Sequence, residues 1–132
     1  MATIPYTIVP ALDAAGAAMA GVFTVTWTGL ANGDQGKWLR MPNYSDRSIQ
    51  VWGQAGGTPT WNIEGSNEQT AAGTDPADPA FLTNPGGTTL SVRTTEEIQQ
   101  ILQNTQWIRP TLTVGAGTCN FTLLVNSMAR RS

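Results

Sequence analysis

The stretch Tyr44–Glu68, YSDRSIQVWGQAGGTPTWNIEGSNE, decides the predicted fold. Ser48–Trp52 and Thr60–Glu64 both alternate between apolar and polar residues, which is the period of a strand with one buried face. Gly53–Gly57, between them, is rich in glycine and tolerates positive φ angles. Two alternating segments around a glycine-containing loop predict a β-hairpin at the centre of the chain.

The segment Val22–Leu30, VFTVTWTGL, alternates over a longer run. We expect Phe23, Val25 and Trp27 to face the core, and the threonines between them to form a face exposed to water or to a partner. We also expect a turn at Asn32-Gly33 and a surface loop at Gln69–Pro79, after which Phe81-Leu82 re-enters the core. Further strands are expected at Gln35–Met41, Thr88–Val92, Gln106–Val114 and Cys119–Val125. Pro110, within the third of these, indicates an edge position or a bulge.

The N-terminal residues differ in character from the rest. Thr3–Val9 has strand character, and Pro5 restricts it to an edge strand or an extended arm. Pro10–Gly21 is expected to be a flexible Ala/Gly linker or a short irregular turn of helix, which either docks on a neighbouring subunit or folds over the domain's own core. We therefore predict an extended arm over residues 1–20 and a single β-sandwich domain over residues 21–132.

One helix is predicted, at Thr94–Asn104. Thr94 and Glu97 have the spacing of a capping box, and Glu96 would add negative charge to the first turn. The apolar residues at 98, 101 and 102 would form a stripe along one side. With roughly seven to nine short strands, the chain is predicted to be all-β: an antiparallel β-sandwich or jelly roll with one short helix, or alternatively an edge-protected barrel.

Composition excludes several classes of function. The 132 residues include no histidine, which removes histidine-based catalysis and histidine-containing zinc sites. The single Cys119 permits no internal disulfide and is expected to be a small buried side chain. Net charge is −2 and no basic run exceeds two residues, so no nucleic-acid role is indicated. No stretch reaches transmembrane length, and no membrane partner is expected.

Targeting and metal signals are weak. Ala11–Ala20 resembles a signal-peptide end, but no positive charge precedes it, so we expect a protein used without secretion. Asp75-Pro76 and Asp78-Pro79 lack the pattern of a calcium loop and are expected to be solvated turns. No cofactor or metal is expected.

Catalytic patterns are also weak. The glycine-rich segment 53–57 precedes a strand, whereas a phosphate-binding loop precedes a helix. Asp46, Glu64 and Glu68 lie close enough in sequence to keep a carboxylate-pair glycosidase open. Trp52 is expected to point outward, as a binding anchor or a sugar-stacking platform, unless its strand is covered on both faces.

Three motifs together carry a family resemblance. SDRSIQV at Ser45–Val51, IEGSN at Ile63–Asn67 and IRP at Ile108–Pro110, followed by a glycine-rich turn and a last strand, resemble small virion proteins of tailed bacteriophages, in particular capsid cement (decoration) proteins of the jelly-roll type. The similarity covers roughly Tyr44–Arg130, and each motif is short.

This resemblance implies a non-enzymatic protein without cofactors, located on the outer surface of the phage head after assembly in the bacterial cytoplasm. It implies a homodimer or homotrimer that bridges copies of the major capsid protein and stabilises the shell. The alternatives are a phage tail or baseplate module, a carbohydrate-binding module using Trp52 or Trp38, and an enzyme. Arg47 and Arg109 either form interfacial ion pairs or brace the fold. The full set of expected interface residues is Ile4, Tyr6, Ile8, Leu12, Trp52, Arg47 and Arg109.

Overall fold

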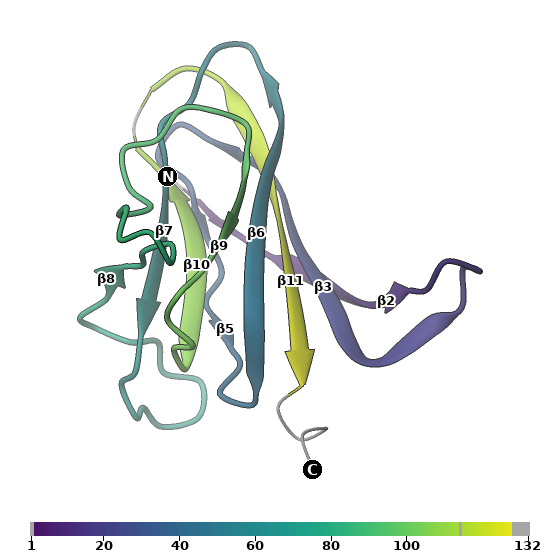
Figure 1. Ribbon diagram of the computed structural model, residues 1–132. Helices are drawn as coiled ribbons and strands as arrows, with labels where there is room; N and C mark the ends of the chain where they lie inside the picture. The colour runs from purple at the N-terminus through teal and green to yellow at the C-terminus, as the bar shows by residue number, and fades with distance from the viewer. Residues whose placement is uncertain (1, 114, 128–132) are drawn as a thin grey trace.

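The computed structural model, described for residues 2–113 and 115–127, is an all-β sandwich of two sheets, as the alternating segments predicted (Figure 1). All strand pairs are antiparallel except β1 with β4. The six-stranded sheet has the order β1-β4-β10-β7-β8, with β5 also paired to β10; its strands are β1 (Thr3–Ile4), β4 (Gln35–Gly36), β5 (Leu39–Arg40), β7 (Trp61–Ser66), β8 (Ala80–Phe81) and β10 (Trp107–Leu112). The five-stranded sheet has the order β2-β3-β11-β6-β9; its strands are β2 (Tyr6–Leu12), β3 (Ala18–Ala31), β6 (Tyr44–Ala55), β9 (Ile98–Gln100) and β11 (Thr118–Ser127).

The core lies between the sheets and contains the apolar sets that the alternation selected. Trp27 on β3 and Trp61 on β7 are completely buried, and Trp61 meets Phe121 on β11 edge to face, with ring centroids 6.2 Å apart. Further buried members from the predicted faces are Val25, Ile49, Val51, Ile63, Leu82, Ile108, Cys119, Leu123 and Val125.

The predicted central hairpin is wrong, although both of its strands exist. β6 pairs with β11 and β9, whereas β7 pairs with β10 and β8 in the other sheet. The intervening loop, in which Gly56 and Gly57 have the expected positive φ angles, therefore crosses between sheets. The reason is that both strands have an apolar face, and two such faces bury each other best across the sandwich.

The predicted helix at Thr94–Asn104 is also wrong: the structure describes this segment as irregular chain around β9. The Glu97 carboxylate binds Arg93 at 2.8 Å, and Glu96 accepts the backbone N–H of Gln54 on β6, also at 2.8 Å. The apolar stripe divides, since Ile101 is buried while Ile98 and Leu102 are exposed. Glu96 and Glu97 therefore bind β6 and Arg93, and they do not form the helix cap that the sequence predicted.

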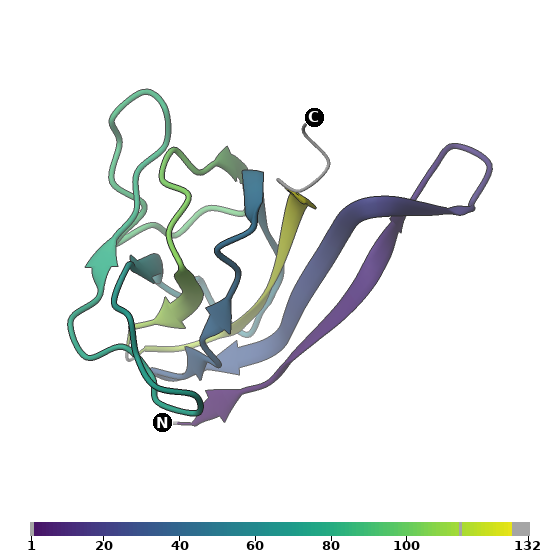
Figure 2. The same ribbon diagram turned by 90° about the horizontal axis from the view of Figure 1, so that it is seen from below.

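The first residues pair with both sheets. β1 pairs with β4, and β2 forms an edge of the five-stranded sheet by pairing with β3, which agrees with the expected edge strand. Towards the N-terminus of β3, the pairing with β11 ends at Val22. Residues 11–21 therefore form a two-stranded extension, here called the hairpin arm. The register shifts between Pro10 and Leu12, and Gly21 has a φ of +77°. The arm extends away from the sandwich (Figure 2).

Several smaller expectations need correction. Pro110 lies in a central strand, not at an edge or bulge: it opposes Ile63 on β7 and, on its other side, falls between the β5 and β4 pairings. The missing N–H of Pro110 therefore interrupts no ladder bond. Gln35–Met41 forms two short strands, β4 and β5. Leu82 is buried but Phe81 is exposed, Thr88–Val92 contributes a single bridge at Thr89, and Val114 lies outside the described residues.

Candidate interaction surface

The outer face of the five-stranded sheet carries two rows of side chains that cross all five strands. Strand register defines both rows, and their alternating neighbours on β3, β11 and β6 point into the core. No member of either row is charged. The first row is Val9, Thr24, Leu124, Ser48 and Gln100, and the second is Thr7, Thr26, Thr122, Gln50 and Ile98.

Hydroxyl groups on this outer face are bonded to one another. The Thr26 and Thr122 Oγ1 atoms lie 3.1 Å apart, and the Trp52 Nε1–H donates to Thr122 Oγ1 at 3.0 Å. Trp52 points outward as predicted and is 40% exposed. Leu124 and Ile98 are also exposed beside a shallow groove of about 240 Å³. The face therefore offers apolar side chains between partly satisfied hydroxyls, a surface that costs little to desolvate.

A larger groove, of about 560 Å³, lies where the hairpin arm leaves the sandwich. Val9, Pro10, Ala11, Leu12, Ala18 and Thr24 line it. Thr24 also lines the groove on the sheet, so the two grooves adjoin. We call the two residue rows, Trp52 and the hairpin arm together the neutral surface.

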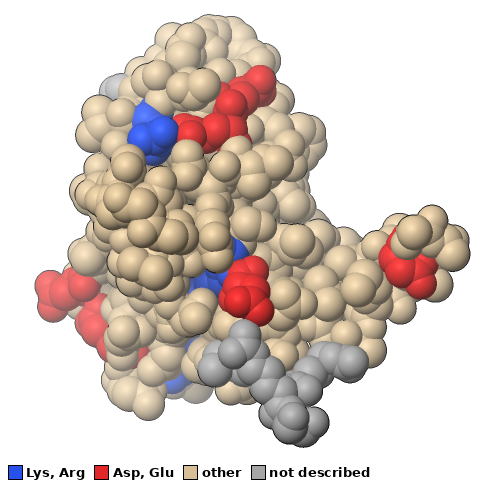
Figure 3. All heavy atoms as spheres, viewed as in Figure 1, with Lys and Arg blue, Asp and Glu red and all other residues tan. Residues whose placement is uncertain are grey.

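The hairpin arm is apolar and almost uncharged. Asp13 is the one charged residue between Ala2 and Gly33, and Figure 3 accordingly shows the arm free of blue and red except near its end. The Asp13 carboxylate accepts the backbone N–H groups of Ala15 and Ala17 at 2.8 and 2.9 Å. The charge thus holds the turn at the end of the arm, and Leu12 beside it is 64% exposed.

The outer face of the six-stranded sheet is different, because it carries charges that are paired within the molecule. Arg109 on β10 binds Glu64 on β7 at 2.9 Å, and its guanidinium lies 4.2 Å from the centre of the Trp38 ring. The Arg40 guanidinium covers Trp107 in the same way, at 5.1 Å. Trp38 is therefore buried beneath its own chain's side chains and is no exposed stacking platform.

The expected interface residues on β1 and β2 fall into two groups. Ile4 and Tyr6 pack against the core, and the Tyr6 ring meets Trp27 edge to face with centroids 5.7 Å apart. Ile8 and Leu12 are at least half exposed. Together with Trp52, these two are the expected interface residues that the structure leaves accessible. Ile8 pairs with the core residue Val25 and so lies on the inner side of β2, whereas Trp52 points outward.

Arg47 and Arg109 brace the fold, and their expected interfacial position needs correction. Arg47 is completely buried. Its guanidinium donates to the backbone carbonyls of Met41, Tyr44 and Thr105 and to the Thr105 hydroxyl, at 2.5–3.3 Å. Burial lowers the pKa of Arg47 to about 10, so the side chain remains charged at neutral pH. Sequence reasoning could not place it, because arginine is seldom fully buried.

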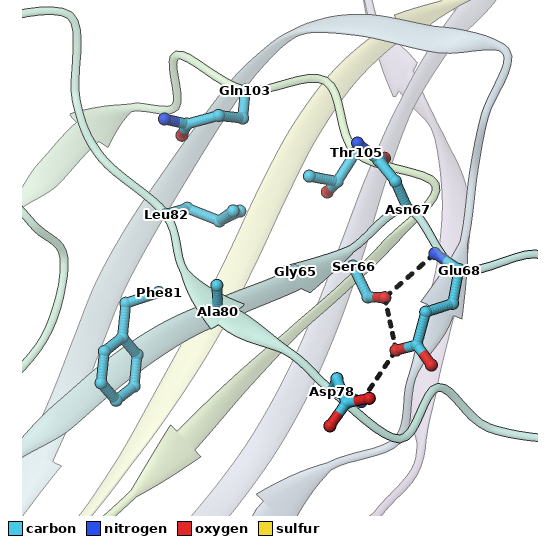
Figure 4. Close-up of a pocket in the computed structure, with 10 residues that line it drawn as sticks. All are labelled: Gly65, Ser66, Asn67, Glu68, Asp78, Ala80, Phe81, Leu82, Gln103 and Thr105. Atoms are coloured by element: carbon cyan, nitrogen blue, oxygen red, sulfur yellow. Dashed lines mark hydrogen bonds between the residues drawn. The ribbon is translucent and has the colours of Figure 1, made fainter.

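The three carboxylates considered as a glycosidase pair lie on different elements. Asp46 is on β6, Glu64 is on β7 in the other sheet, and Glu68 follows β7. Glu68 lies instead beside Asp78 at a pocket of about 580 Å³, shown in Figure 4. Within residues 2–113 and 115–127, no group of three or more acidic, cysteine or histidine side chains has metal-site geometry.

We expect the loop Gln69–Pro79 to loosen when Glu68 is protonated. The backbone N–H groups of Asp78 and Ala77, at 2.8 and 3.0 Å, and the Ser66 hydroxyl lower the pKa of Glu68. Because the folded-state pKa is lowered, the contribution to stability is complete above the usual carboxyl range and is lost as pH falls through the lowered pKa. NMR should show the Ala77 and Asp78 amide signals moving together in that acidic range. E68Q should abolish that step, and an unchanged step in E68Q would contradict the assignment.

Cys119 is a core side chain, as expected. It is completely buried on β11. Burial first, and then the negative charge of Glu96, raises the pKa of the Cys119 thiol to about 12. At neutral pH it is therefore a protonated, apolar group in the core.

Comparisons with known proteins add no relative. No family model, curated protein or solved structure matches this chain. Among the residues that the structure describes, no helix has the length and apolar character of a membrane span. The fold and the neutral surface are therefore the observations from which a function must be argued.

Proposed function

We propose that this protein is a capsid cement protein, which binds the outside of a bacteriophage head as an oligomer and bridges major capsid proteins. The observation that carries the proposal is the neutral surface: an apolar arm that continues into two uncharged rows of side chains on the five-stranded sheet. The exposed Asp46 on β6 lies outside both rows. On the other sheet, Arg109 is paired with Glu64. The surface is suited to burial against protein. The resemblance to phage decoration proteins supplies the identity of the partner.

The motifs behind that resemblance have structural roles in this chain. Arg47 in the first motif is buried, and Arg109 in the third binds Glu64 in the second. Gly65 in the second has no room for a side chain, because an added Cβ would lie 2.7 Å from the Thr105 hydroxyl oxygen. The identity of the partner therefore rests on the resemblance, and the neutral surface supports burial of this side of the molecule against another protein.

Bridging several capsid subunits needs only moderate contacts. Once one copy in an oligomer is bound, the others are held near their sites at an effective concentration that reaches the millimolar range for short connections. The uncharged rows reduce the desolvation cost of each contact. Such a protein adds many reversible contacts across subunit boundaries, and their sum resists expansion of the shell.

Shortening the hairpin arm is expected to weaken head attachment at least about tenfold, or about 1.4 kcal/mol. Asn-Gly in place of residues 12–20 keeps the strand pairing of Tyr6–Pro10 with Phe23–Trp27. Deleting all of residues 1–20 is a poorer test, because it removes Ile4 and Tyr6 from the core. Attachment is measured by co-sedimentation with heads that lack the protein.

A variant on the opposite sheet provides the control. Phe81 is 48% exposed on β8, and Phe81→Ser should leave attachment unchanged. Wild-type protein that fails to sediment with heads contradicts the proposal. Binding to a glycan array that disappears in Trp52→Ala would instead support the carbohydrate-binding alternative, because Trp52 is the exposed ring on the neutral surface.

A further inference from the structure

We propose that the neutral surface joins two copies of this chain: the outer faces of their five-stranded sheets meet, and the hairpin arm of each copy lies across the other. This inference deepens the proposed function, on which it rests only in treating the surface as an interface. It names a second copy as the occupant of the surface, so that head attachment depends on the surface through formation of the pair.

The hairpin arm has the character of a segment that is stabilised by a partner. All residues from Leu12 to Ala20 are exposed, on both sides of a two-stranded ribbon. A two-stranded hairpin is at best marginally stable in water without a further covering layer. The arm nevertheless carries Leu12 and Met19, which are 64% and 40% exposed, and the preceding Ile8 and Val9 are each about half exposed. Val9 and Leu12 line the groove, so covering them would remove apolar area from water.

The outer sheet face matches this arm in chemistry. Six of residues 11–20, ALDAAGAAMA, are alanine. The small side chains of the arm permit close approach to the threonine, serine and glutamine side chains of the two rows. Neither row on that sheet contains a charge that would be desolvated. Because Thr24 lines both grooves, an arm entering one groove continues directly onto the other.

The available area also favours a reciprocal pair. Five strands about 4.8 Å apart and about seven residues high cover roughly 550 Å², and one face of the arm adds roughly 160 Å². Their sum, about 700 Å² per copy, approaches the roughly 800 Å² per partner of a standard stable interface. The arm alone would bury far less area than a stable interface needs. A pair in which both faces and both arms participate is therefore the arrangement that the area supports.

Sedimentation velocity of the purified protein tests this inference without phage heads. Wild-type protein at micromolar concentration should sediment as a species of twice the 14.0 kDa chain mass. Leu12→Asp on the arm and Leu124→Asp on the sheet face should each raise the dimer dissociation constant at least about tenfold, because each would bury a charge. Phe81→Asp, on the opposite sheet, should not.

Mixing the two variants gives a sharper result. A heterodimer of Leu12→Asp with Leu124→Asp retains one arm–face contact in which both sides are unaltered. The mixture should therefore dimerise more tightly than either variant alone. Circular dichroism checks that Leu124→Asp remains folded, and Ile98→Asp, at the 67% exposed end of the second row, provides a second face variant.

The possible failures are distinguishable. Wild-type protein that stays monomeric at about 100 μM, or face variants that dimerise normally, would overturn the inference. Attachment of such a monomer to heads would preserve head binding and remove the oligomer from the proposed function. Dimers that do not attach to heads would contradict the proposed function and leave this inference standing.

Discussion

Arg47→Met is expected to lower the free energy of unfolding by about 3–5 kcal/mol, because several buried acceptors lose their hydrogen-bond donor at once. The guanidinium of Arg47 ties together the carbonyl groups of Met41, Tyr44 and Thr105. Methionine fills similar volume but donates no hydrogen bond, so buried acceptors lose their partners at about 1–3 kcal/mol each. Urea denaturation followed by tryptophan fluorescence measures the loss.

Two further variants separate hydrogen bonding from charge. Arg47→Lys keeps the charge but has one nitrogen in place of the planar fork, so it should recover only part of the loss. Arg40→Met removes an exposed arginine bonded to Gln106 and Gln69 and should cost less than about 1 kcal/mol. A loss below about 1 kcal/mol in Arg47→Met would contradict the bracing role.

Trp61→Ala is expected to cost about 3–5 kcal/mol, the usual range for removing a large buried aromatic side chain. Trp61 is completely buried, and its Nε1–H donates to the Thr95 carbonyl at 3.1 Å. Its removal leaves a cavity against Phe121 and also detaches the irregular segment that holds Arg93 and Glu97. Thermal and urea unfolding should both report the loss, and amide exchange over Thr94–Gln100 should accelerate.

Trp52→Ala is the matched control, because Trp52 lies in the same organising stretch but faces outward. Its indole is 40% exposed and makes one hydrogen bond, to Thr122. The expected cost is smaller than that of Trp61→Ala, because Trp52 is partly exposed and its removal opens no enclosed cavity between the sheets. Equal losses in the two variants would contradict the assignment of Trp61 to the core and Trp52 to the surface.

The faces of the strands could be predicted from the sequence, but their neighbours could not. Alternation at Ser48–Trp52 and Thr60–Glu64 identified buried side chains, including Ile49 and Trp61. Alternation says which side of a strand is buried and nothing about which strand lies beside it. A glycine-rich loop between two half-buried strands is compatible with a hairpin and with a crossing between sheets, and the sandwich uses the crossing.

The helix prediction failed because a local pattern competed with tertiary bonds. Thr94 and Glu97 have the spacing of a capping box, but Glu97 is held by Arg93, and hydrogen bonding from Arg93 lowers its pKa. Pairing of Ile98 with Gln50 then extends the sheet. A three-turn helix is marginal without strong packing, so these contacts decide the conformation.

Part of the candidate surface could be predicted from the sequence. The small, apolar character of Pro10–Gly21 and the threonine face of Val22–Leu30 indicated a segment and a strand suited to a partner. The neutral surface as a whole depends on strand register, which aligns Thr24, Leu124 and Ser48 from distant parts of the chain. Register is set by the folded sheet, so no local signal could have assembled those rows.

Cryo-electron microscopy of phage heads carrying this protein tests the central claim most directly. We predict that the outer face of the five-stranded sheet and the hairpin arm are covered by protein, with Leu12 and Leu124 within contact distance of another chain. The charged outer face of the six-stranded sheet should remain more open. An arm extending freely into solvent, with Thr24 and Leu124 uncovered, would contradict the account.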